Sequence, residues 1–128
     1  DRAVLRSMHY FNETKRAKDE AEVLKNGDIN RFIQLVNESG ESSYKYLQNL
    51  YSNSNVGEQG LSLAIALTKQ FLNGKGACRV HGGGFAGTIQ CYIPNDRLDA
   101  YCTMIEAIYG ENSCVPLKIR PVGGYELV

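Results

Sequence analysis

The sequence predicts an α+β domain in which helices come first and an antiparallel sheet follows. Three observations predict it. Apolar residues recur at helical spacing over most of residues 2–72, two short segments around a glycine run alternate apolar and polar residues, and one more amphipathic helix follows them. The chain has 128 residues, which is the length of one domain.

The first half of the chain reads as helical. Residues 2–24 place apolar side chains on one face and a mixture of acidic and basic side chains on the other, which is typical of an amphipathic helix. An Asn-Gly-Asp break then ends that helix and begins a second one over 29–40. A serine cap starts a third helical segment over 44–51, and a polar loop follows it.

The most apolar helical pattern covers residues 59–72, where nearly every turn carries Leu, Ile, Ala or Phe on more than one face. We expect this helix to be the most buried one. Apolar and polar residues then alternate in 77–81 and again in 88–93, which predicts two half-buried strands. A glycine-rich loop joins them.

A helix follows the second strand. Residues 94–96 cap it, its apolar residues recur at i, i+3, i+4 and i+7, and Gly110 closes it. Residues 115–119 alternate again, and Pro116 suggests that this strand lies at an edge; a last short strand covers 125–128. This order favours a ferredoxin-like, split βαβ antiparallel sheet with helices packed on one face and with extra N-terminal helices.

The charge balance excludes two classes of partner. Fourteen basic and fourteen acidic residues give zero net charge, so no excess field attracts nucleic acid or an anionic membrane surface. The longest apolar run is much shorter than a membrane-spanning helix, and the N-terminus lacks the apolar core of a signal sequence. We therefore expect a cytoplasmic protein with no nucleic-acid partner and no membrane partner.

The four cysteines, Cys78, Cys91, Cys102 and Cys114, lie in apolar patterns and form no Cys-x-x-Cys pair. Such spacing favours reduced core residues over disulfides or a zinc site. The sequence therefore predicts no metal ligands in this chain.

The run His-Gly-Gly-Gly-Phe-Ala-Gly at 81–87 is the one segment whose pattern suggests chemistry. Glycine permits positive φ and a close approach of backbone to ligand, and successive N–H groups in such a turn can bind an anion. Glycines between strands also form ordinary tight turns, so the pattern alone leaves both interpretations open. No Gly-Lys-Ser/Thr follows the run and no helix begins after it, which excludes a Walker A loop and a dinucleotide loop.

Two further features have a functional and a structural interpretation. His81 at the edge of the loop could contact phosphate, although a strand-end histidine that faces solvent or a partner domain is the commoner case. Arg79, Lys118 and Arg120 could form a basic rim if their strands are neighbours. We favour a solvated face for these three.

Residues 76–94 resemble the third, C-terminal glycine-rich motif of galactokinases, which are members of the GHMP family of small-molecule kinases. The similarity extends to residues 2–12 with the helix that follows them, to the Gly27-Asp28 break and to the helix end at Glu38-Ser39. Their order and spacing are similar to those of the C-terminal domain of galactokinases. The resemblance thus covers most of the chain.

In that family two domains meet around ATP and galactose, and the product is galactose 1-phosphate. The resemblance implies that residues 1–128 are a GHMP C-terminal domain, the rear part of a longer kinase, which fits a chain that begins at Asp1 within a helical pattern. It implies that ATP and Mg²⁺ serve the full-length enzyme and that the N-terminal domain, with the catalytic residues, is the partner. This chain alone is then expected to bind neither cofactor, to be inactive, and to expose an apolar patch.

The resemblance assigns no catalytic residue to this chain. It implies a glycine-rich loop lining the phosphate and substrate cleft, with His81 as a candidate contact at its edge; the loop residues are Gly82, Gly83, Gly84, Phe85 and Gly87. Ala86 stands where the family usually has glycine, and residues 42–60 lack the Arg-Asp and Glu-Leu-Asp sequences usual in the family. The second difference bears on the substrate more than on the fold.

Two other functions stay open at this point. Another GHMP kinase, such as one for N-acetylgalactosamine or mevalonate, shares the loop. A sugar-responsive sensor or a ligand-binding domain shares the fold without the activity. An intact base and phosphate loop in the N-terminal part would favour the enzyme.

Overall fold

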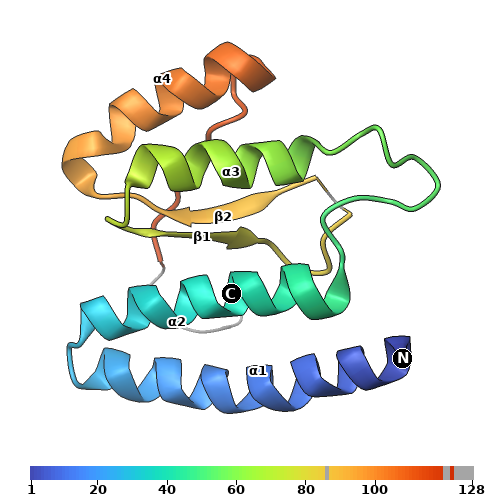
Figure 1. The fold of residues 1–128 in the computed structure, drawn as a ribbon. Helices are drawn as coiled ribbons and strands as arrows, with labels where there is room; N and C mark the ends of the chain where they lie inside the picture. Colours follow the sequence, from blue (N-terminus) through green and yellow to red (C-terminus); the bar gives the residue numbers. More distant parts are fainter. Residues whose placement is uncertain (86, 120–121, 123–128) are drawn as a thin grey trace, which may run out of the picture.

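The computed structural model describes residues 1–85, 87–119 and 122. Within these residues the protein has four α-helices and one two-stranded antiparallel sheet, which confirms the α+β prediction (Figure 1). The elements in chain order are α1 (Arg2–Lys25), α2 (Ile29–Ser42), a π-helical turn (Ser43–Leu47), α3 (Gly60–Leu72), β1 (Ala77–Val80), β2 (Ile89–Tyr92), a 3₁₀ turn (Asn95–Arg97) and α4 (Leu98–Tyr109).

Local signals set helix boundaries where the sequence predicted them. Asp28 caps α2, since its carboxylate accepts a hydrogen bond from the Arg31 N–H at 3.0 Å. α4 ends at Gly110, whose φ of +96° leaves the helical conformation. The helix predicted after the second strand is therefore confirmed, with its first residues forming the 3₁₀ turn.

The two strands pair in a register that places Cys78 opposite Cys91, and helices contact both faces of the sheet. Cys91 on one face lies 3.3 Å from the hydroxyl of Tyr101 in α4. Arg79 on the other face pairs with Glu13 of α1 at 3.3 Å. The prediction that helices pack on one face is thus wrong, because a sheet of two short strands is narrow enough for helices to reach both of its sides (Figure 1).

One side chain of α2 closes the outer edge of β1. The Asn37 amide donates to the Gly76 carbonyl at 3.0 Å, and its oxygen accepts the Cys78 N–H at 3.3 Å. Backbone N–H and carbonyl groups stay unpaired at an uncovered strand edge. Asn37 therefore makes the hydrogen bonds that a neighbouring strand would otherwise make. Gly40 lets α2 come this close, since a Cβ there would lie 3.0 Å from the Cβ of Arg79.

The core lies between α2, α3, α4 and the sheet. Its buried apolar residues in the described part of the chain are Leu35, Val36, Leu50, Ala64, Leu72, Ala77, Cys78, Val80, Tyr101 and Ile105. The expectation that residues 59–72 form the most buried helix is wrong: α3 buries Ala64, Thr68 and Leu72, whereas Leu63 is 51% exposed. Only one side of α3 faces the sheet, so the apolar residues on its other sides remain accessible.

α1 forms as predicted, but it packs through a polar face. Glu13 accepts a hydrogen bond from the Ser39 hydroxyl of α2 and pairs with Arg79 of β1. Val4 and Phe11 remain 61% and 71% exposed. The contacts of Glu13 therefore leave an apolar stripe of α1 outside. No helix among the described residues has both the length and the apolar character needed to cross a membrane.

Two other predicted elements differ from the structure. The third helical segment is not a separate helix, because α2 continues directly into the turn Ser43–Leu47, which ends where Gln48 adopts a φ of +54°. Residues 115–119 form no strand and are exposed. Alternation alone does not produce a strand: α2 occupies the outer edge of β1, residues 115–119 do not pair with β2, and Pro116 lacks an N–H. The strand predicted over 125–128 lies outside the described residues.

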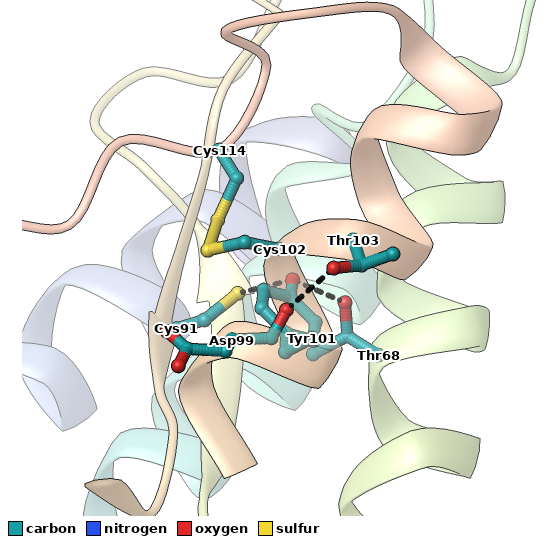
Figure 2. Close-up of a disulfide and its surroundings, with 7 residues drawn as sticks. All are labelled: Thr68, Cys91, Asp99, Tyr101, Cys102, Thr103 and Cys114. Atoms are coloured by element: carbon teal, nitrogen blue, oxygen red, sulfur yellow. Dashed lines mark hydrogen bonds between the residues drawn. A yellow bond between two sulfur atoms is a disulfide. The ribbon is translucent and has the colours of Figure 1, made fainter.

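The cysteines form two pairs. Cys102 of α4 and Cys114 form a disulfide with their Cα atoms 5.3 Å apart (Figure 2), and Cys78 and Cys91 are free. The prediction of four reduced cysteines is thus wrong for one pair. After Gly110 the chain turns back toward α4 and brings the two cysteines into bonding range, a proximity that linear spacing does not reveal.

An exposed ion pair links α2 to α3. The Lys69 ammonium donates to the Glu41 carboxylate, and this hydrogen bond is the main cause that holds the pKa of Glu41 below its ordinary value. A carboxyl whose pKa is lowered by folding stabilises the protein above its unfolded pKa, and the contribution is lost as pH falls through the folded value.

We therefore expect Lys69→Ala to lower the free energy of unfolding by about 0.5 kcal/mol near neutral pH, since exposed pairs are weak. The difference from the wild type should shrink as the pH falls below the ordinary Glu41 pKa of 4.5. Urea unfolding at neutral and acidic pH measures both values. Lys75→Ala, which removes an exposed lysine at the end of the same segment, is the control. A difference that is equal at both pH values contradicts the assignment.

Candidate functional site

The glycine-rich loop joins β1 to β2 and lies at the end of the strand pair (Figure 1). Its two ends are held together at the base, where the His81 N–H donates to the Thr88 carbonyl at 3.1 Å. The paired strands therefore hold the described loop residues, 82–85 and 87, at one end of the sheet. Ala86, which stands where glycine was expected, lies outside the described residues.

Gly84 is the buried point of this loop. It has a φ of +78°, and a Cβ built on it would lie 2.1 Å from the carbonyl oxygen of Asn49. Only glycine combines that conformation with so close a backbone neighbour. The Gly84 N–H also donates to the His81 carbonyl at 3.4 Å. This predicted site residue therefore holds the loop in place.

Asn49 is the residue that supports the loop, and the sequence pattern did not indicate it. Its side-chain amide donates to the Gly83 carbonyl at 3.1 Å, and its own carbonyl accepts the Phe85 N–H at 3.2 Å. Asn49 is 3% exposed, and within the described residues its Oδ1 atom is buried without a hydrogen-bond partner. Because residues 44–51 were expected to be helical, nothing in the sequence pattern indicated that Asn49 would hydrogen-bond to the glycine-rich loop.

Gly82 and Gly83 are the part of the loop that is open to a ligand. Both are exposed, and in the described part of the chain neither N–H has a hydrogen-bond partner. A Cβ at either position would have nothing within 4 Å. Two exposed N–H groups with no side chain between them can approach an anionic oxygen closely. Gly87 and Phe85 are exposed beside them, and Phe85 is 64% accessible.

Two cavities of the described region lie away from the loop. The larger, of about 560 Å³, is lined by α1 and α2 and includes Arg16 and Lys45; the smaller, of about 250 Å³, lies between α2 and α3 and includes Leu50 and Lys69. Neither is lined by a residue of 81–87. The loop lies outside both of these cavities and its residues 82, 83, 85 and 87 are exposed, so a ligand held there needs a second surface to enclose it.

The two described members of the possible basic rim, Arg79 and Lys118, do not lie on neighbouring strands. Arg79 pairs with Glu13 at 3.3 Å on the side of the sheet that faces α1. Lys118 lies in an exposed segment that is not a strand, and Arg120 lies outside the described residues. His81 is exposed, and its imidazole makes no hydrogen bond within the described residues. Among the described side chains, His81 is the one that lies at the loop and is exposed there.

The residues described do not provide a metal site. Among them no three His, Cys, Asp or Glu side chains come together as metal ligands. The loop offers N–H donors but no carboxylate, and Mg²⁺ prefers oxygen ligands. The described loop residues thus offer hydrogen-bond donors to an anionic oxygen and no ligands to a metal ion.

Comparison with known proteins finds galactokinases. The chain is 26% identical to the galactokinase of Glaesserella parasuis serovar 5 (strain SH0165) over 107 residues, 27% identical to that of Haemophilus influenzae (strain PittEE) over 107 residues, and 28% identical to that of Actinobacillus succinogenes over 104 residues. No protein-family model matches the chain, and no solved structure matches it.

These matches cover 84%, 84% and 81% of this chain but only 26%, 26% and 25% of the relatives. The chain thus spans about a quarter of the length of the curated relatives it matches. Any stretch of 107 residues in a chain of 128 contains residues 22–107, so the similarity spans the glycine-rich loop. Most of this chain, the loop included, is therefore a galactokinase-like region.

Proposed function

We propose that this chain is the C-terminal domain of a cytoplasmic galactokinase of the GHMP family, which transfers the γ-phosphoryl group of ATP to the C1 hydroxyl of galactose. The products are galactose 1-phosphate and ADP. The observation that carries the proposal is the exposed loop with the unpartnered N–H groups of Gly82 and Gly83, on a chain similar to proteins named galactokinase.

In this reaction the loop donates hydrogen bonds to the phosphate groups, and its lack of side chains leaves room for them. Phosphoryl transfer depends on positioning and on neutralising the charge of the moving group, and backbone N–H groups supply part of that. The described residues of this loop contain no carboxylate to act as a base or to hold Mg²⁺. The base, the metal ligands and the main nucleotide site are therefore assigned to an N-terminal domain.

Exposed apolar side chains support the presence of such a partner domain. Val4, Met8 and Phe11 on successive turns of α1 are 61%, 44% and 71% exposed. Side chains of this kind are ordinary when single, but several on neighbouring turns are typical of a surface that packs against another domain. A second domain would also supply the surface that the loop needs in order to enclose a nucleotide.

Gly83→Ala in the full-length protein is expected to lower kcat/KM for ATP-dependent galactose phosphorylation by about tenfold, since small displacements of a reacting group are costly. A methyl group at this position meets no atom of this chain, because nothing lies within 4 Å of the built Cβ. The loss would therefore come from the ligand or the partner domain. A coupled assay of ADP release with galactose measures it.

Gly57→Ala serves as the matched control. It also adds one methyl to an exposed loop, with its nearest neighbour, the Asn55 Oδ1 atom, at 3.8 Å, and we expect unchanged activity. Full activity of Gly83→Ala would contradict the role of the loop. Normal turnover by residues 1–128 alone would contradict the need for an N-terminal domain.

A further inference from the structure

The two free cysteines face each other across the sheet that carries the loop. The register pairs Cys78 of β1 with Cys91 of β2. The Cys78 N–H points away from β2 to Asn37, whereas three residues later the His81 N–H bonds to Thr88 on the partner segment. Cys78 and Cys91 are therefore a non-hydrogen-bonded pair of the antiparallel ladder, where Cα atoms lie about 4.5 Å apart.

This spacing suits a disulfide. Disulfide-bonded cysteines have Cα atoms about 4.4 to 6.8 Å apart, so the backbone already meets the requirement. The two sulfur atoms are 3.5 Å apart in the free pair. Closing them to about 2.05 Å needs a side-chain rotation and no movement of the strands.

The surroundings of the pair make its two sulfurs unequal. Cys78 is 1% exposed, whereas Cys91 is only partly buried. The hydrogen bond between the two sulfurs lowers the pKa of Cys91, and the hydroxyls of Tyr101 and Thr68, which are bonded to each other (Figure 2), act in the same direction. The hydrogen bond to Cys91, followed by burial, raises the pKa of Cys78. Cys91 is thus the sulfur that ionises first and that a reagent reaches first.

We propose that Cys78 and Cys91 are a reversible disulfide site that exchanges with small-molecule disulfides of the glutathione class. The Cys91 thiolate attacks one sulfur of the reagent, which breaks the reagent's S–S bond and releases one small thiolate. Cys78 then gives up its proton and attacks the Cys91 sulfur, forming the protein disulfide and expelling the second small thiol. Two protein thiols are oxidised by two electrons, and one small disulfide is reduced to two thiols.

The bond would tie the strands together below the glycine-rich loop. Residues 78 and 91 flank the base of that loop, which in the free form is closed by the His81 to Thr88 hydrogen bond. A covalent link at this level restricts the separation of β1 from β2 when the rest of the protein opens. The disulfide of Cys102 and Cys114 lies elsewhere and ties the chain after α4 to that helix.

Peptide mapping tests the site directly. Trypsin cuts after Lys75, Arg79, Arg97 and Lys118, so Cys78 lies on peptide 76–79 and Cys91 on peptide 80–97, while Cys102 and Cys114 share peptide 98–118. The protein is treated with glutathione disulfide, free thiols are alkylated, and the digest is analysed by mass spectrometry. We expect peptides 76–79 and 80–97 to appear as one linked species that separates after dithiothreitol treatment.

Two variants separate the roles of the sulfurs. Cys78→Ser should retain glutathione on peptide 80–97, because no second thiol resolves the mixed disulfide. Cys91→Ser should leave peptide 76–79 alkylated and free of glutathione, because Cys78 is buried. Unlinked, fully alkylated peptides from the treated wild type would overturn the proposal. So would a link from peptide 80–97 to peptide 98–118 in place of one to 76–79.

Discussion

Gly84→Ala is expected to lower the free energy of unfolding by about 3 kcal/mol. A left-handed conformation alone costs a non-glycine residue about 1 to 2 kcal/mol. The new Cβ would also meet the Asn49 carbonyl oxygen, 2.1 Å from its ideal position. Relief of that overlap requires the turn to move from Asn49, which breaks the hydrogen bond from the Phe85 N–H to the same oxygen. Urea unfolding measures the loss, and amide exchange at Phe85 reports the broken bond.

Gly83→Ala is the control for this effect, because it adds the same methyl to the same loop in open space. We expect it to change the free energy of unfolding by less than about 0.5 kcal/mol. Gly82→Ala separates backbone strain from steric overlap, since the φ of Gly82 is +61° and nothing lies within 4 Å of a Cβ built there. We expect it to lower the free energy of unfolding by about 1 kcal/mol. If Gly84→Ala were no worse than Gly82→Ala, contact with Asn49 would not hold the loop.

The elements that the sequence predicted correctly are those with local signals. Asp28 caps α2 through the Arg31 N–H, and Gly110 ends α4, so each boundary is decided by one residue and its near neighbours. The two strands around the glycine run also follow from alternation alone, and they form as β1 and β2.

The incorrect predictions concern which segments pack or pair with each other, and a local sequence pattern does not determine this. The apolar face of α1 was the obvious one to bury, yet the contacts of Glu13 with Ser39 and Arg79 bring its polar face inward. Residues 115–119 alternate like a strand, but a strand also needs a partner, and these residues pair neither with β1, whose outer edge α2 covers, nor with β2. Neither outcome is visible without the three-dimensional arrangement.

The sequence was enough to predict which residues form the candidate loop, but not which residue holds that loop in place. Four glycines in the loop marked the segment, and the structure leaves Gly82 and Gly83 exposed while it buries Gly84. Asn49 was missed because its role comes from a contact across 34 positions of sequence. The disulfide was missed for a similar reason, since the return of the chain toward α4 depends on the turn that begins at Gly110.

Asn37→Leu is expected to lower the free energy of unfolding by about 3 kcal/mol, because it leaves two backbone groups at the buried edge of β1 without partners. The Cys78 N–H and the Gly76 carbonyl both bond to the Asn37 amide, and Cys78 is 1% exposed. Leucine has the same branched shape and number of side-chain heavy atoms as asparagine but no polar atom, so the loss measures hydrogen bonding more than packing. Urea unfolding gives its size, and faster exchange of the Cys78 amide gives its location.

Asn30→Leu isolates this effect from any change in helix propensity, since it makes the same substitution at an exposed position of α2. We expect it to stay within about 0.5 kcal/mol of the wild type. Asn37→Asp keeps an acceptor for the Cys78 N–H but sets a carboxylate against the Gly76 carbonyl, so its loss should fall between the two leucine variants. Equal stabilities for Asn37→Leu and Asn30→Leu would show that β1 needs no partner at this edge. Because β1 carries one end of the glycine-rich loop, that result would also remove Asn37 from the chain of contacts that positions the loop.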